Sequence, residues 1–255
     1  MPRLVAALLA LARTAAADLP CAAKPETCVP IKTATGDLMM PAVALGTWRG
    51  SYGDCADNDY SCVRAKAKAS VGDWLDLGGR HIDGANDYRT QVEIGEAVAG
   101  ADRDPSATGV AASADCAASP YYDPGTKVRQ ETWKAMELLV KLGKAVAVGI
   151  SDYNATHIEE TLEVAEVPVA LHQVEWNPKK HDEDMLKLCQ KHGIQLQAWS
   201  PLGGAEGSVT LKWSLQRGVA VVTGTDNKDH MASDLDLFGF ALGYYDEVAA
   251  ISALQ

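Results

Sequence analysis

The chain has 255 residues, and its 34 acidic residues outnumber the 23 basic ones to give a net charge of -11. This length fits one (β/α)8 barrel of about 250 residues or two smaller domains. The acidic balance argues against a nucleic-acid partner, because such binding depends on Lys and Arg neutralising phosphates. A small anionic ligand is still allowed, since local donors rather than net charge bind it.

The N-terminus has the pattern of a secretory signal. Arg3 precedes an apolar run from Leu4 to Ala12, and small residues continue to Ala17. We expect cleavage after Ala17, a single domain over 18–255, and a protein of the secretory pathway or the extracellular space. The run is too short for a bilayer, which needs about twenty residues, so no membrane partner is expected. An Ala-rich helix at the bottom of the fold, an organelle transit sequence and a cytoplasmic location are the alternatives.

Cysteine usage is compatible with export. Cys21 and Cys28, and likewise Cys55 and Cys62, are close in sequence and lie in polar, loop-like stretches. If the chain is exported, we expect these two pairs as disulfides, although spacing alone does not fix connectivity. Cys189 lies on a predicted helix with a histidine three residues later, but no second pair of residues with ligand spacing supports a metal site.

The second half of the chain alternates regularly between apolar runs and helical patterns. The predicted strands cover 145–150, 169–175, 194–200 and 219–223, and the predicted helices begin at Asn154, Asp182, Ser208 and Asp226 or Asn227. The strands are apolar without strict alternation, and each is followed by a helix of about ten residues. This order is typical of a parallel sheet covered by helices. A short helix over 246–253 is expected in the tail.

The first half is less regular. After a signal and lead-in over 1–40, strands are predicted at 42–48 and 81–83, helices at 63–78 and 90–99, and a loop insertion at 49–61. Between 101 and 128 only a weak strand over 108–113 precedes loop-like residues, and a helix then ends near 143. A βαβ unit needs about thirty residues. We therefore predict a (β/α)8 TIM-type barrel that is incomplete, with one βα unit missing or degenerate around 101–128.

Five motifs in order identify a family resemblance. They are MPAVALGTW over 40–48, RHIDGANDY over 80–88, GISDYN over 149–154, HQVEWNP over 172–178 and AWSPLG over 198–203. Over about 40–100 and 129–238 the chain resembles the aldo-keto reductases, which are (β/α)8-barrel enzymes that use NADPH. The resemblance implies reduction of aldehyde or ketone carbonyls to alcohols by hydride transfer.

The resemblance assigns the catalytic residues. It makes Tyr88 the proton donor and places Asp83 beneath it. In the family, a lysine on the third strand links this pair and lowers the pKa of the tyrosine. The third strand here places Ser113 or Ala114 at the lysine position, and the histidine of the family's fourth-strand HWP motif has no counterpart.

A substitute for the missing lysine is conceivable. Lys127 or Arg129 lies close enough in sequence to reach toward the site. His81 and His172 are better explained as structural side chains packed under their strands than as catalytic groups.

The resemblance also assigns a cofactor set for NADP(H), with NAD(H) as the alternative. The set comprises Gly46, Thr47, Ser151, Asp152, Gln173, Trp199, Ser200, Leu202, Thr225 and His230. Within it, Ser151, Asp152 and Gln173 would meet the carboxamide, and Trp199 would stack on the nicotinamide. The family's lysine at the 2′-phosphate end is missing and His230 replaces an arginine, so we expect weaker discrimination for NADPH over NADH.

Three hypotheses follow from the sequence. The first is a monomeric oxidoreductase that reduces small carbonyl compounds. The second is a nucleotide-binding barrel with little turnover, because the lysine and histidine are missing. The third is an incomplete variant that folds poorly, since a missing βα unit opens the barrel and exposes sheet edges.

Overall fold

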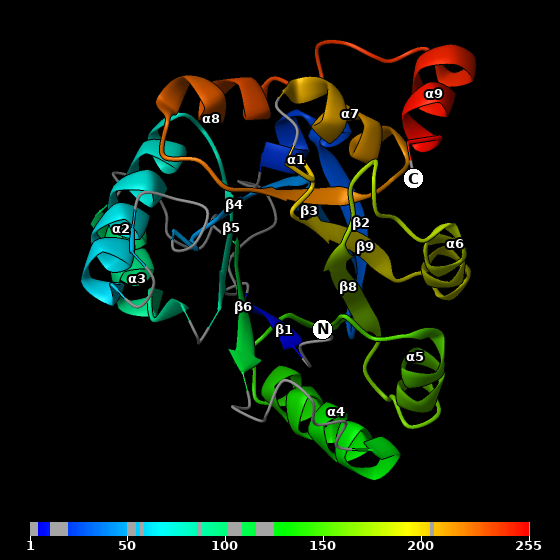
Figure 1. Cartoon of the computed structure of the whole chain (residues 1–255). Helices are drawn as coiled ribbons and strands as arrows, with labels where there is room; N and C mark the ends of the chain where they lie inside the picture. Colours follow the sequence, from blue (N-terminus) through cyan, green and yellow to red (C-terminus); the bar gives the residue numbers. More distant parts are fainter. Residues whose placement is uncertain are drawn as a thin grey trace.

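The computed structural model describes residues 5–10, 20–49, 55–56, 59–85, 88–100, 109–115, 125–204 and 207–254. Its strands form a barrel in the order β1-β6-β5-β4-β10-β9-β8-β7. All neighbouring pairs from β6 through to β7 in this order are parallel, whereas both pairings of β1 are antiparallel. Helices lie outside the strands, with α2 and α3 on one side and α5 and α6 on the other (Figure 1).

The first half of the barrel holds fewer complete units than the second. Its elements are β4 (Val43–Gly46), α2 (Tyr60–Asp76), β5 (His81–Ala85), α3 (Gln91–Gly100) and β6 (Gly109–Asp115). Helix α2 begins with Asp59, whose side chain accepts a hydrogen bond from the Cys62 N–H, and it buries Val63, Val71 and Trp74. This half supplies Asp83 on β5 and Tyr88 in the segment between β5 and α3.

The second half follows the predicted alternation closely. Its elements are α4 (Gly125–Lys141), β7 (Ala147–Ser151), α5 (Ala155–Leu162), β8 (Val169–Glu175), α6 (Glu183–His192), β9 (Gln195–Trp199), α7 (Ser208–Gln216), β10 (Ala220–Thr223), α8 (Lys228–Leu235), η4 (Tyr244–Val248) and α9 (Ala249–Ser252). Asn154, Asp182 and Asn227 accept backbone N–H groups in the first turns of α5, α6 and α8, as N-caps do. Gly193 ends α6 with a φ of 67°, a left-handed conformation that glycine adopts without strain.

Strand β1 (Val5–Ala10) occupies the place of the missing unit. It pairs antiparallel with β6, where Leu8 faces Ala112, and with β7, where Leu8 faces Val148. In chain order a further parallel strand would stand between β6 and β7, so the expectation of an incomplete (β/α)8 barrel is confirmed. The residues of β1 also belong to the expected signal, whereas its cleavage point at Ala17 lies outside the described residues.

A hairpin that the sequence did not suggest packs against the amino-terminal ends of the barrel strands. Strands β2 (Cys28–Thr33) and β3 (Gly36–Pro41) pair antiparallel after α1 (Pro20–Ala23) and the short η1 helix (Pro25–Thr27). The lead-in, for which no strand was predicted, therefore contains two. Apolar side chains of the hairpin pack on those of the barrel strands, and this cluster contains Ile31, Met40, Ala147, Ala170, Leu171 and Ala220.

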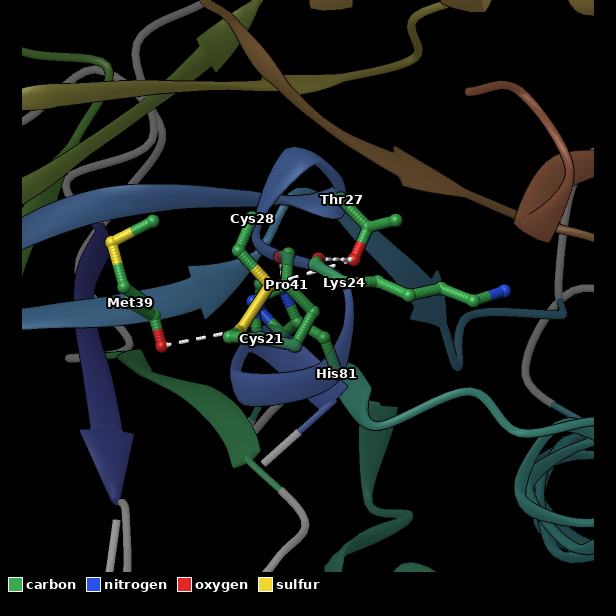
Figure 2. Close-up of a disulfide and its surroundings, with 7 residues drawn as sticks. All are labelled: Cys21, Lys24, Thr27, Cys28, Met39, Pro41 and His81. Atoms are coloured by element: carbon green, nitrogen blue, oxygen red, sulfur yellow. Dashed lines mark hydrogen bonds between the residues drawn. A yellow bond between two sulfur atoms is a disulfide. The ribbon is translucent and has the colours of Figure 1, made fainter. Parts of the chain in front are cut away.

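Both expected disulfides are present. Cys21 bonds to Cys28 and thereby joins α1 to the start of β2 (Figure 2). Cys55 bonds to Cys62 and joins the segment after β4 to the first turn of α2. No helix in the described ranges is long and apolar enough to cross a membrane.

Candidate active site

Asp83 lies inside the barrel on β5. Its side chain is buried, and the Gln173 Nε2 donates a hydrogen bond of 3.0 Å to Asp83 Oδ1. Burial raises the pKa of Asp83 to about 7, and the hydrogen bond from Gln173 opposes this rise. Thr47 fixes the backbone of Asp83, because its backbone N–H and its hydroxyl both donate to the Asp83 carbonyl oxygen.

Gln173 carries this contact across the barrel interior. It lies on β8, which is separated from β5 by β4, β10 and β9. The same Nε2 donates a second hydrogen bond of 2.8 Å to Gln197 Oε1 on β9. Sequence reasoning missed Gln197, although a glutamine in the middle of an otherwise apolar strand could have drawn notice. The three side chains form a continuous polar network that we call the Asp–Gln–Gln network.

Tyr88 lies between β5 and α3 and is half-buried. Its ring centroid is 5.2 Å from that of Trp48, which follows β4. The next residue, Arg89, has a φ of 54° and places its guanidinium 4.4 Å from the Tyr60 ring centroid on α2. Aromatic contacts on both sides of this turn thus hold it against α2 and the end of β4.

The family's lysine and histidine have no counterpart on the strands that occupy their places. Strand β6, which pairs with β5, reads GVAASAD and includes both Ser113 and Ala114. Strand β1, which stands after β6 in the barrel, reads VAALLA. Neither strand therefore supplies a lysine or a histidine at its place in the barrel.

The two proposed substitutes for the lysine lie elsewhere. Arg129 on α4 is buried in a pair with Glu160 on α5, with its NH2 2.5 Å from Oε2. Lys127 is highly exposed on α4 and lies 3.9 Å from Glu131. The idea that either residue replaces the lysine is wrong, because both face carboxylates on the outer helices.

A second group of predicted residues lies at the carboxyl ends of β7, β8 and β9. Ser151 is buried at the end of β7, and the Asp152 N–H donates to the Gln173 carbonyl oxygen over 2.9 Å. The Trp199 indole Nε1 lies 3.3 Å from Asp152 Oδ1, which fixes the indole ring. Burial raises the pKa of Asp152, and the hydrogen bond from Trp199 opposes this rise. The structure therefore brings the predicted carboxamide and stacking residues together.

The residues predicted for the cofactor phosphates lie on the loops after β9 and β10. Ser200 is exposed with a φ of 50°, and Leu202 is half-buried in the following turn. Thr225 is half-buried after β10, and His230 is exposed on α8. Gly46 lies at the end of β4, where a side chain would approach Val222 to 3.1 Å, so it permits close strand packing.

Sequence reasoning missed a cation at this end of the barrel. Arg49 is buried, and its NH2 donates a hydrogen bond of 2.6 Å to the Thr225 carbonyl oxygen. It had been placed in a loop insertion, where a long charged side chain is ordinarily solvated. An acidic group lies nearby on α8, where burial raises the pKa of Asp234 to about 6, while Thr223 and His230 oppose this rise.

His81 and His172 are structural, as predicted. His81 Nδ1 donates to the Pro41 carbonyl oxygen over 2.9 Å beneath the barrel (Figure 2), and burial lowers its pKa to about 4. His172 Nε2 accepts from the Tyr153 N–H over 3.1 Å, and burial lowers its pKa to about 3. Both imidazoles are therefore neutral at physiological pH and hold backbone in place.

An incomplete (β/α)8 barrel whose polar side chains meet inside it and at the carboxyl ends of its strands has the layout of a barrel enzyme. The family model described as the aldo/keto reductase family matches residues 115–208. The resemblance to the aldo-keto reductases that the sequence motifs indicated is therefore confirmed.

Similarity to individual proteins agrees with this resemblance. The chain is 32% identical to the glyoxal reductase of Bacillus subtilis over 48% of its own length, and it spans only 51% of that relative. It is 27% identical to the D-galacturonate reductase of Fragaria ananassa, with 80% of this chain and 83% of that relative covered. The structure of a Bombyx mori aldo-keto reductase in complex with NADP superposes with a TM-score of 0.69 at 21% identity, over 88% of this chain and 92% of that one.

Proposed function

We propose that the protein reduces the carbonyl group of small aldehydes or ketones to an alcohol with NADPH or NADH. The observation that carries this proposal is the grouping of Ser151, Asp152, Gln173 and Trp199 at neighbouring strand ends. Relatives named as reductases of glyoxal and of D-galacturonate support the same chemistry.

The donor groups on these strand ends suit a nicotinamide nucleotide. Among the described residues the Gln173 side chain uses its nitrogen for both of its hydrogen bonds, which leaves its oxygen to accept from a carboxamide, while the fixed Trp199 indole offers a flat face for stacking. Ser200, Leu202 and Thr225 line the path expected for the phosphates, and Arg49 supplies a buried positive charge beside Thr225. NADPH, when bound, supplies the hydride.

Tyr88 is the proposed proton donor. As the carbonyl carbon gains a hydride, its oxygen becomes basic and takes the phenolic proton. A neutral tyrosine can give up this proton without help, but a nearby cation makes it a stronger acid. Asp83 cannot supply that help, because its own ionisation would disfavour the tyrosinate.

A second candidate function is nucleotide binding with little turnover. It is favoured by the amino acids of β6 and β1, which include neither the lysine nor the histidine of the family set. Under this hypothesis the cofactor-binding residues are retained, whereas the rate of proton transfer falls. Loss of general acid assistance typically lowers a rate by about 10²–10⁴-fold.

One experiment separates the two candidates. Quenching of tryptophan fluorescence measures the Kd for NADPH, and loss of NADPH absorbance with a reactive aromatic aldehyde then measures turnover. Binding with turnover supports the reductase, and binding without turnover supports the second candidate. Failure to bind NADPH or NADH would reject both.

We further propose that the protein matures in an oxidising compartment, on the secretory pathway. Its two disulfides support this, since such bonds persist where thiols are kept oxidised. N-terminal sequencing of protein purified from its natural source tests the expected cleavage after Ala17. An intact start at Met1 would reject export through this signal.

A further inference from the structure

Gln197 has a feature that its own packing does not explain. The side chain is 0% exposed, and its Nε2 has no hydrogen-bond partner in the part of the chain that the structure describes. A buried amide N–H without a partner destabilises the folded state, because it has lost its hydrogen bonds to water. A leucine or methionine would fill the same place in the barrel without that cost. The glutamine at this position therefore suggests a role outside the packing of β9.

The side-chain hydrogen bond that Gln197 makes to Gln173, within the described part of the chain, points to that role. Its Oε1 accepts a hydrogen bond of 2.8 Å from Gln173 Nε2, the same nitrogen that donates to Asp83. A glutamine amide has one end that donates and one that accepts, and it can turn to exchange them. With acceptors at both Asp83 and Gln197, the Gln173 nitrogen is drawn inward, and its oxygen is turned away from both.

We propose that Gln197 is a positioning residue, which fixes the Gln173 amide with its N–H₂ toward Asp83 and its oxygen presented to the carboxamide of a nicotinamide nucleotide. The assignment of that ligand rests on the proposed function. Gln197 itself touches neither the ligand nor the reacting atoms; it acts through Gln173. A substitution of Gln197 should therefore change nucleotide affinity only while Gln173 still presents its side-chain oxygen.

A double-mutant cycle tests this dependence. The variants are Gln197→Met, Gln173→Met and the double variant, with Kd for NADPH read by tryptophan fluorescence quenching. Gln195→Met is the matched control, because Gln195 lies on the same strand but bonds the carbonyl oxygens of Leu196 and Gly218 instead. Melting temperatures of all five proteins, the unaltered chain included, verify folding.

The expected result is strongly non-additive. Gln197→Met should raise the Kd about five- to tenfold, the usual effect of losing one well-placed hydrogen bond. In the Gln173→Met background the same change should alter the Kd by less than twofold, and Gln195→Met should have no effect. Equal effects of Gln197→Met in both backgrounds, or an unchanged Kd in the single variant, would overturn the proposal.

A second measurement keeps this proposal separate from the proposed function. If the unaltered chain binds neither NADPH nor NADH, the proposed function fails, and the Asp83 carboxyl can still be titrated by carbon NMR. Gln197→Met should raise the pKa of Asp83, because the donated hydrogen bond from Gln173 that lowers it is no longer fixed. Gln195→Met should not. An unchanged Asp83 titration in Gln197→Met would show that Gln197 does not position Gln173.

Discussion

The two halves of the barrel differ in how completely they keep the family pattern. From β7 to β10 each strand is followed by a helix, and three of these helices begin at side-chain caps. From β4 to β6 each strand is also followed by a helix in chain order, but β1 stands antiparallel where a further parallel strand is missing. The regular half carries most of the predicted cofactor residues, whereas the irregular half carries Asp83 and Tyr88. Binding and catalysis can therefore be lost separately in this fold.

The largest expected effect tests whether the irregular half still performs chemistry. Tyr88→Phe removes the proposed proton donor and should lower the rate of aldehyde reduction by about 10²–10⁴-fold, with the Kd for NADPH unchanged. Tyr60→Phe is the control, since its ring faces Arg89 on the same turn and has no proposed part in catalysis. Retained turnover in Tyr88→Phe would reject the assignment.

Asp83 should make the irregular half sensitive to pH. Burial raises the pKa of Asp83 from its usual value near 3.8 to about 7, so the folded state holds this proton more tightly than the unfolded state. Its contribution to stability is then greatest at low pH and falls between about pH 4 and 7, by as much as about 4 kcal/mol. Denaturant unfolding of the unaltered chain and of Asp83→Asn across this range measures the difference. If the difference in unfolding free energy between the unaltered chain and Asp83→Asn does not change with pH, the raised pKa of the buried Asp83 carboxyl is contradicted.

Strand β1 provides the next test, because it joins the two halves. A chain that begins at Asp18 lacks the pairing of β1 with β6 and β7 and should melt roughly 5–10 °C lower than the full chain. A chain that begins at Val5 keeps the strand and is the control. Both chains are produced without export, so that no signal peptidase cleaves them, and their disulfides are then formed by oxidation in vitro. Equal melting of all three would mean that β1 contributes nothing to the barrel.

Introducing a lysine on β6 should restore part of the catalytic set that the irregular half lacks. In the parallel register of β5 and β6, Asp83 pairs with Ala111 and Ala85 pairs with Ser113. Ser113→Lys should therefore raise alcohol oxidation about tenfold, and carbonyl reduction less, because only oxidation requires tyrosinate. Ala114→Lys, at the next register position, is the control. Equal gains from both lysines would indicate a non-specific effect of charge.

The smallest expected effect concerns the cofactor end of the regular half. His230 is exposed and Asp234 adds an acidic group nearby, so little fixed positive charge faces a 2′-phosphate there. The Kd values for NADPH and NADH should differ by less than about tenfold, and His230→Arg should increase the preference for NADPH. A preference for NADPH above about a hundredfold in the unaltered chain would contradict this.

Much of the regular half could be predicted from sequence. Apolar runs bounded by Asn154, Asp182, Gly193 and Asn227 gave its strands and helices, because caps and periodicity are local properties. The two disulfides were also expected from spacing, although spacing left their connectivity open. The hairpin over 28–41 was missed, since its Pro and Thr residues resemble a loop until a partner strand is present.

By itself the sequence determined the family resemblance, the missing βα unit and the identity of Asp83 and Tyr88 as the candidate catalytic pair, because motifs and their order are written along the chain. Only the tertiary structure brought Gln197 to Gln173 and Asp83, turned Arg49 toward Thr225, and placed β1 between β6 and β7. These contacts join residues far apart in the chain, and each depends on strand order and register. A barrel fixes both through packing and hydrogen bonds between distant segments, which no local pattern records.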